Sequence, residues 1–160
     1  GDYPALANDI ASEGDNWWCV GQERNSGVGY LRKAWINRSN NNLKREGPAS
    51  SLTCIKYENG TFYIGGNDGY HAMYWSATQK SSKENRINNC QEYDLSSGTT
   101  QAKVDDIDVL NGIVVCCGYE RSAVGSNIPK LWINGSEYPL GEQLNNYSNV
   151  RPCAVAIVKR

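Results

Sequence analysis

The chain of 160 residues lacks most of the side-chain patterns on which common chemistries depend. It has one methionine and one phenylalanine. It also has a single histidine, His71, and no C-x-x-C pair, and these two absences argue against a structural zinc site. A G-x-S-x-G nucleophile elbow is missing, and so is a glycine-rich phosphate loop with its lysine. We therefore expect no metal and no cofactor, and we assign no catalytic residue.

Charge and hydropathy argue against two further classes of partner. The net charge is −1, and lysines and arginines are scattered among acidic residues rather than gathered in a basic stripe for nucleic acid. Apolar runs such as residues 113–117 are far shorter than the roughly 18 residues that cross a bilayer as a helix. We expect neither a nucleic-acid partner nor a transmembrane segment.

The composition that is present favours β structure. Ten tyrosines and five tryptophans accompany 16 glycines and many asparagines and serines. Aromatic residues favour strands, whereas glycine, asparagine and serine favour the turns between them. No segment of helical length has an apolar period near 3.6 residues. The sequence therefore predicts an all-β fold.

Three apolar runs end in a glycine, and each is followed by a strand-like segment that contains a tryptophan. The glycines are 44 and 53 residues apart, and the tryptophans follow after 14, 10 and 14 residues: Gly21 and Trp35, Gly65 and Trp75, Gly118 and Trp132. A repeat of this length is typical of stacked or circular β-repeats, because one unit cannot bury its apolar face alone. We expect the three tryptophans to pack between sheets.

Each unit contains four strand-like segments. Asn59-Gly60 and Asn111-Gly112 separate the first segment from the second, and Asn-Gly at such a place predicts a hairpin with a type I′ turn. The tryptophan segment is the third, and a weaker fourth lies near Leu43, Leu95 and Leu140. We predict a single domain, 1–160, with units at about 5–50, 51–101 and 102–151.

These units predict three four-stranded antiparallel repeats that resemble propeller blades, plus one surplus C-terminal strand at 152–158. The alternative is a β-trefoil, which also uses three repeats but closes a barrel. Propellers usually need four to eight blades, so we expect two chains to associate as a homodimer, either as a six-bladed ring or as two half-rings. The surplus strand should pair with the first unit's sheet, either of the same chain or of the neighbouring chain. The polar stretch 76–89 reads as an inserted surface loop.

The cysteines and a cluster of aspartates are two further features that could be either structural or functional. Cys19 matches Cys116 in the repeat, and such residues behave most simply as small buried apolar side chains, with a disulfide as the alternative. Cys116 and Cys117 point to opposite faces of a strand, so both are buried only if both faces are covered. The acidic cluster Asp105, Asp106 and Asp108 reads as a charged strand edge, with a calcium site as the alternative.

The candidate ligand-binding residues are aromatic side chains near the polar stretch of the second unit, together with two adjacent tryptophans of the first unit, one of which should face outward. Aromatic area with a polar rim suits recognition, and loops carry most binding sites. On this basis the candidate surface consists of Trp17, Trp18, Tyr70, His71 and Tyr74.

Two motifs carry a resemblance to a known family. Val115-Cys116-Cys117-Gly118-Tyr119-Glu120 and Lys130-Leu131-Trp132-Ile133-Asn134-Gly135 resemble the V-Y-V-A-G-Y-E … K-Y-W-K-N-G repeat of secreted and surface-anchored bacterial propeller-like proteins. Unit one matches in Val20-Gly21-Gln22-Glu23 and Lys33-Ala34-Trp35-Ile36-Asn37, and unit two departs most. The resemblance implies a bacterial protein that is secreted or attached to the cell envelope. We expect its targeting segment to be absent from this chain.

The absence of catalytic motifs and the resemblance together favour a non-catalytic binding or scaffolding module of the bacterial cell envelope, with a protein or glycan as ligand. The alternative is a carbohydrate-active hydrolase or lyase that uses carboxylates from separate loops, such as Glu120 or Asp68.

Overall fold

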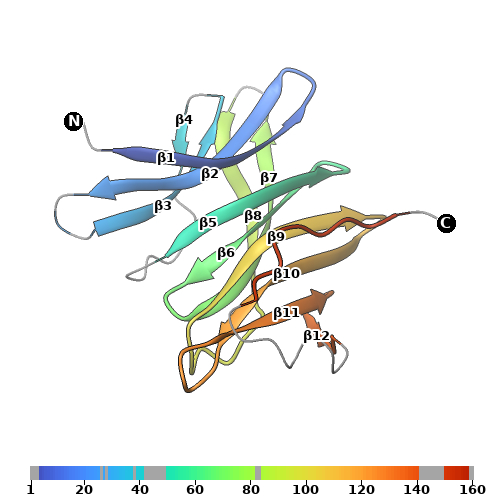
Figure 1. The fold of residues 1–160 in the computed structure, drawn as a ribbon. Helices are drawn as coiled ribbons and strands as arrows, with labels where there is room; N and C mark the ends of the chain where they lie inside the picture. The colour runs from blue at the N-terminus through green and yellow to red at the C-terminus, as the bar shows by residue number, and fades with distance from the viewer. Residues whose placement is uncertain are drawn as a thin grey trace.

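The computed structural model describes residues 4–25, 27, 29–37, 39–41, 50–81, 84–140 and 150–158. These residues form twelve strands and no helix. The strands make three four-stranded antiparallel sheets, and none of the sheets closes into a barrel (Figure 1). The predicted all-β fold of three four-stranded repeats is therefore confirmed, and the β-trefoil alternative is wrong.

Each sheet takes its strands in chain order, and we call each sheet a blade. Blade 1 contains β1 (Ala5–Glu13), β2 (Asn16–Asn25), β3 (Gly29–Ile36) and β4 (Ser39–Asn41). Blade 2 contains β5 (Ser51–Glu58), β6 (Thr61–Asp68), β7 (His71–Ser81) and β8 (Glu84–Asp94). Blade 3 contains β9 (Ala102–Leu110), β10 (Ile113–Arg121), β11 (Asn127–Ile133) and β12 (Ser136–Tyr138).

The fourth strands lie slightly before the leucines that predicted them. Leu95 and Leu140 follow β8 and β12 rather than lying in them, and Leu43 falls outside the described residues.

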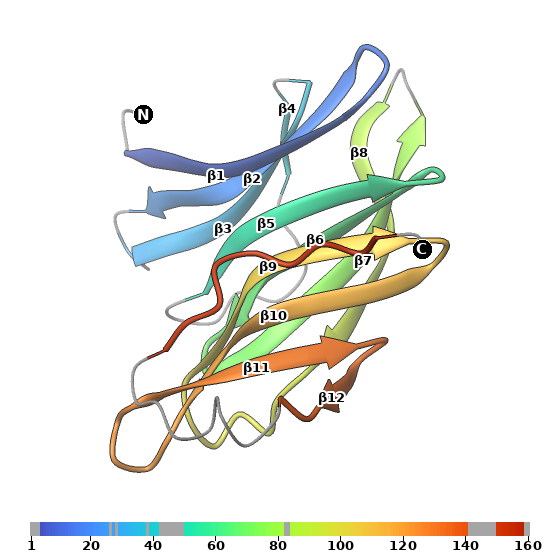
Figure 2. The ribbon, with the colours of Figure 1, turned by 45° about the vertical axis from the view of Figure 1, so that its right-hand side comes forward.

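The blades meet along their first strands. β1, β5 and β9 lie side by side, and the later strands of each blade spread away from this line (Figures 1 and 2). One apolar core fills the space between blades 1 and 2, and a second fills the space between blades 2 and 3. Trp75 and Trp132 are buried in these cores, as predicted, whereas Trp35 is half-buried on the outer face of blade 1.

The Asn-Gly dipeptides form the predicted hairpin turns. The φ angles are 48° and 85° at Asn59-Gly60, and 53° and 76° at Asn111-Gly112. Asn134-Gly135 in the β11–β12 turn is similar, at 50° and 84°. Positive φ at both central residues is what a type I′ turn requires, and asparagine followed by glycine tolerates it best.

A bulge in the first strand lies opposite a glycine of the second strand in every blade. The glycines are Gly21, Gly66 and Gly118. A Cβ atom on any of them would lie 1.9–2.1 Å from a carbonyl oxygen of the first strand, so only glycine allows this approach. The register also makes Gly66 the counterpart of Gly21 and Gly118, which corrects the predicted choice of Gly65.

The polar stretch 76–89 is not an inserted loop over its described residues. Residues 76–81 belong to β7 and residues 84–89 belong to β8, and these two strands pair antiparallel. Ala77 and Ile87 on this hairpin pack against the core between blades 1 and 2. The indole Nε1 of Trp18 donates a hydrogen bond to Gln79 Oε1, at 3.5 Å. These contacts with blade 1 hold an otherwise polar segment in extended form.

Residues 150–158, which we call the C-terminal segment, do not form the predicted strand. The segment runs beside β9 without a backbone ladder (Figure 2). The N–H groups of Val155 and Ile157 donate to the carboxylates of Asp106 and Asp108, at 2.9 and 2.7 Å. The predicted pairing with the first blade's sheet is thus wrong within this chain. The acidic cluster binds this segment instead of forming a solvated edge.

All six cysteines are free thiols. Cys116 and Cys117 are both buried, so both faces of β10 are covered as the sequence required. Burial, with nearby Asp106, raises the pKa of the Cys117 thiol to about 12, and burial also raises the pKa of Cys54 and Cys116. Cys153 lies exposed on the C-terminal segment.

The bulge glycines predict a ranking of glycine-to-alanine substitutions. Gly66→Ala should destabilise the protein by at least about 4 kcal/mol, because the new Cβ meets backbone that cannot move cheaply. Gly112→Ala, which has positive φ and no heavy atom within 4 Å, should cost only about 1–2 kcal/mol. Urea unfolding of both variants measures the difference, and equal costs would contradict the role of the bulge.

Thiol reactivity should follow burial and thiolate character. Cys153 should react with iodoacetamide in the folded protein more than about tenfold faster than Cys54, Cys116 or Cys117. Mass spectrometry of the labelled peptides measures these rates, with the urea-unfolded chain as the control in which all six react. A disulfide-linked peptide, or rapid labelling of Cys116, would contradict the arrangement.

Candidate functional site

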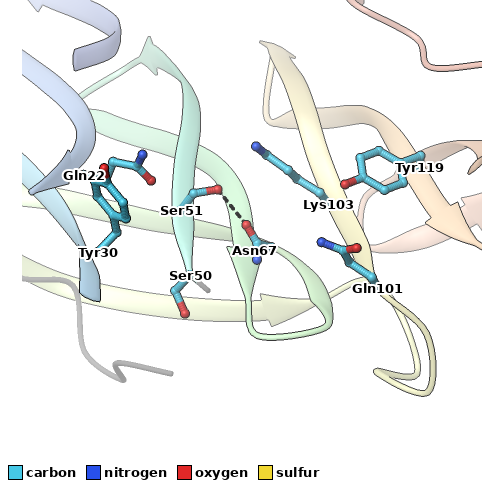
Figure 3. A pocket seen from close by; sticks show the side chains of 8 residues that line it. All are labelled: Gln22, Tyr30, Ser50, Ser51, Asn67, Gln101, Lys103 and Tyr119. Atoms are coloured by element: carbon cyan, nitrogen blue, oxygen red, sulfur yellow. Dashed lines mark hydrogen bonds between the residues drawn. The ribbon is translucent and has the colours of Figure 1, made fainter. Parts of the chain in front are cut away.

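A pocket of about 270 Å³ opens where the three blades meet, at the start of β5 and β9 (Figure 3). Every blade contributes to its wall. The lining residues are Gln22 and Tyr30 from blade 1, Ser50, Ser51 and Asn67 from blade 2, and Gln101, Lys103 and Tyr119 from blade 3.

The repeat itself places part of this lining. Gln22, Asn67 and Tyr119 each follow the bulge glycine of their blade directly. Because the glycine fixes the second strand against the first, the next side chain starts from the same position in each blade. The three blades therefore bring two amides and a phenol together at one end of their shared inner edge.

The blade 2 side of the pocket is held in place by its own hydrogen bonds. The Ser51 hydroxyl donates to Asn67 Oδ1 at 2.6 Å (Figure 3). Asn67 Nδ2 donates to the Gly69 carbonyl at 2.9 Å. The Ser50 hydroxyl donates to Asp68 Oδ1 at 2.8 Å. These bonds orient the polar groups before any ligand arrives.

Among the described residues that line the pocket, Lys103 has the only cationic side chain. Its side chain extends from β9 toward β5 (Figure 3). Burial lowers the pKa of Lys103, opposed by nearby Asp105 and assisted by the positive charge of Arg151. Asp105 is itself held by Arg151, at 2.6 Å, and no carboxylate among the described residues forms an ion pair with Lys103.

Asp68 and Glu120, the two carboxylates given as examples for the hydrolase alternative, lie outside this lining. Asp68 Oδ2 lies 3.8 Å from Arg32 Nη2, and Glu120 Oε2 lies 3.5 Å from Lys130 Nζ. Glu120 also accepts a hydrogen bond from the Thr100 hydroxyl, at 3.2 Å. Both carboxylates therefore have structural partners.

The aromatic residues proposed from the sequence do not form one surface. Trp18 is fully buried and stacks on Phe62, with ring centroids 4.0 Å apart. Tyr74 is buried and stacks on Tyr93, at 4.3 Å.

The other three ligand-binding candidates, Tyr70, His71 and Trp17, lie in two separate parts of the molecule. Tyr70 is exposed in the β6–β7 turn, and the adjacent His71 has its Nδ1 2.7 Å from Asp94 Oδ2. Trp17 lines a separate apolar hollow of about 290 Å³ on the outer face of blade 1.

Sequence reasoning missed the pocket because its residues are polar and far apart in the chain. One signal was available, namely the side chain that follows the glycine of each repeat. With Gly65 chosen as the glycine of the second unit, that signal pointed to Gly66 instead of Asn67.

No protein-family model matches the chain, and no curated protein or solved structure matches it either. Among the described residues there is no helix long and apolar enough to cross a membrane. The same residues contain no group of three or more histidine, cysteine or acidic side chains arranged to hold a metal ion.

The position of Lys103 predicts a pH-dependent effect on stability. Because the folded-state pKa of Lys103 is lowered, the unfolded chain binds more protons between that pKa and the ordinary value near 10.5, and stability rises with pH there. Lys103→Met should stabilise the protein at pH 7 by less than about 1 kcal/mol, since a partly exposed ammonium keeps some hydration.

The gain from Lys103→Met should shrink as the pH rises toward 10.5. Urea unfolding at several pH values measures it, and Lys56→Met, at an exposed lysine of β5, is the matched control. A gain that is independent of pH would contradict the inferred cause.

Proposed function

We propose that the protein is a non-catalytic binding module that holds an acidic glycan in the pocket between its three blades. The observation that carries this proposal is the lining: amides, hydroxyls, one ammonium and two tyrosine rings converge from three blades. Amides and hydroxyls donate and accept hydrogen bonds as sugar hydroxyls do, and tyrosine rings offer flat apolar area with a polar tip.

Lys103 narrows the class of ligand. A partly buried ammonium that has no carboxylate partner among the described residues favours a ligand that brings a negative charge. A charge-assisted hydrogen bond from an ammonium to a carboxylate is stronger than a neutral one. Uronic acids and other carboxylated sugars combine this charge with hydroxyl groups, which suits the rest of the lining.

The arrangement favours binding over glycoside hydrolysis. Hydrolysis of this kind usually needs two carboxyl groups on either side of the scissile bond. None of the described residues that line the pocket has a carboxylate, and Asp68 and Glu120 are each engaged with a cation. A hydrolase or lyase would have to bring its acid and base from elsewhere.

The repeat motifs support a place for this module outside the cytoplasm of a bacterium, in secreted form or at the cell envelope. Their resemblance to secreted and surface-anchored repeats is the basis of this part of the proposal. We also propose that two chains associate, because rings of blades usually need at least four.

The binding proposal predicts a selective effect of Lys103. An array of acidic and neutral glycans identifies a ligand, and isothermal titration calorimetry then compares variants. Lys103→Met should weaken binding of a carboxylated glycan at least about tenfold, because the charge-assisted bond is lost. Lys56→Met should leave the affinity unchanged.

Product analysis of the same glycan separates the two classes of function. Unchanged glycan length together with binding supports the module, whereas shortened products would support the hydrolase or lyase. Absence of binding to every acidic glycan, or full affinity in Lys103→Met, would contradict the proposal.

A further inference from the structure

The outer face of blade 1 exposes a set of residues that the other blades bury. Ile10, Cys19 and Trp35 lie side by side across β1, β2 and β3. The equivalent residues are Ile55, Ile64 and Trp75 in blade 2, and Ile107, Cys116 and Trp132 in blade 3. Those six are at most 2% exposed, whereas Ile10 is 61% exposed.

This face is also hollowed. Ala5, Ala7, Trp17, Cys19 and Trp35 line the apolar hollow of about 290 Å³ on it. Contiguous exposed apolar surface of this kind marks a site of contact with another surface. The two buried copies of the same face show what that surface looks like.

In blade 2 the equivalent face is covered by the opposite face of the preceding blade. That covering face consists of Trp18, Val20, Ala34 and Ile36 of blade 1. By register, blade 3 has Val115, Cys117, Leu131 and Ile133 at the same four positions. All four are apolar, so blade 3 presents the type of face that covers a tryptophan face elsewhere in the chain.

The C-terminal segment now occupies part of that position on blade 3. The Ile55 N–H donates to Asp9 Oδ2 at 2.8 Å, and the Val155 N–H donates to Asp106 Oδ2 at 2.9 Å. Asp9 and Asp106 are equivalent, because each pairs with the residue just before its bulge glycine. Val155 therefore occupies the place on blade 3 that Ile55, in the first strand of the next blade, occupies on blade 1.

The segment is attached by few interactions. Besides the bonds to Asp106 and Asp108, Arg151 pairs with Asp105 at 2.6 Å and lies over the Tyr119 ring, with its Cζ 4.6 Å from the ring centroid. The Arg151 side chain is half exposed, so its ion pair contributes little. A complete first strand with three more strands behind it would bury far more apolar surface.

We propose that the C-terminal segment is a displaceable cap, and that blade 1 of a second copy takes its place on blade 3. The Ile10 N–H, which donates to Asp9 Oδ1 of its own chain at 2.8 Å while the face is uncovered, then donates to Asp106 of the other copy instead, because Ile10 is the equivalent of Ile55. Two such contacts between two copies close a ring of six blades, within the usual range of four to eight. This inference rests on the proposed association of two chains and does not depend on which ligand the pocket binds.

The first experiment weakens the attachment of the C-terminal segment and leaves unchanged the two faces that would meet, namely the outer face of blade 1 and the covering face of blade 3. Arg151→Ala removes the ion pair with Asp105, and Val155→Pro removes the N–H that Asp106 accepts. Analytical ultracentrifugation at about 1 to 100 µM follows the association, which obeys mass action. The double variant should dimerise at concentrations at least about tenfold lower than the wild type.

Two arginine substitutions identify the face. Ile10→Arg in the double variant should abolish the dimer, because it places a charge in the apolar contact. Val124→Arg, at a residue 88% exposed in the β10–β11 turn, is the matched control and should leave the dimer intact. A dimer that survives Ile10→Arg would overturn the proposed cap but would leave the proposed association of two chains standing. Monomers at all concentrations would overturn both proposals.

The wild-type chain offers a second measurement that does not depend on the folding of the double variant. Hydrogen exchange at Val155 and Ile157 should become faster as protein concentration rises, because the second copy displaces the segment. Ile10→Arg alone should remove this dependence. Protection that does not change with concentration in the wild type, up to concentrations at which it dimerises, would overturn the cap.

Discussion

The close approach of the first and second strands at each bulge is the constraint on which the rest of the structure depends. The bulge needs glycine at Gly21, Gly66 and Gly118, and it turns the side chain of the bulged residue toward the next blade. Asn8 Nδ2 donates to the Leu52 carbonyl at 2.5 Å, and the Thr53 hydroxyl donates to the Val104 carbonyl at 2.6 Å. These two bonds are equivalent in register. They join inner strands that share no backbone ladder, so the fan of blades follows from one local irregularity repeated along the chain.

The same repeat explains the motifs that carried the family resemblance. In the G-x-E and K-x-W patterns, Glu23 lies 3.2 Å from Lys33 in blade 1, and Glu120 lies 3.5 Å from Lys130 in blade 3. The motif residues thus form an ion pair between the second and third strands. Blade 2 has no lysine at this place, and its Asp68 lies 3.8 Å from Arg32 of the preceding blade. The motifs are structural, which is consistent with a site built from the residues between them.

Local signals in the sequence were enough to predict the turns and most of the strands. Asn-Gly at positive φ and apolar runs that end in glycine act within a few residues, so they need no knowledge of the fold. The adjacent glycines Gly65 and Gly66 could not be told apart, because only the pairing register shows which of them lies opposite the bulge. The prediction of a loop at residues 76–89 was wrong for a related reason. Their extended form depends on contacts with blade 1, which a polar sequence does not display.

The candidate site was less predictable than the fold. Side chains alternate between the two faces of a strand, but this alternation does not show which face a neighbouring blade covers. Trp18 and Tyr74 looked suitable for ligand binding but are core residues, since each lies on a face that the neighbouring blade covers. The C-terminal segment had the composition of a strand, yet it has carboxylates beside it instead of a partner strand. Polar residues such as Gln22 and Lys103 come together only when three blades are assembled.

The proposed cap contacts the lining of the pocket, and this contact has a thermodynamic consequence. Arg151 lies over the ring of Tyr119, which lines the pocket. Burial lowers the pKa of Lys103, and the charge of Arg151 adds to this effect. Release of the C-terminal segment would remove both influences from blade 3. A ligand in the pocket would therefore bind the capped and uncapped states with different affinities. By linkage, the same free energy would appear in the capping equilibrium, so occupation of the pocket and exchange of the cap would be coupled events.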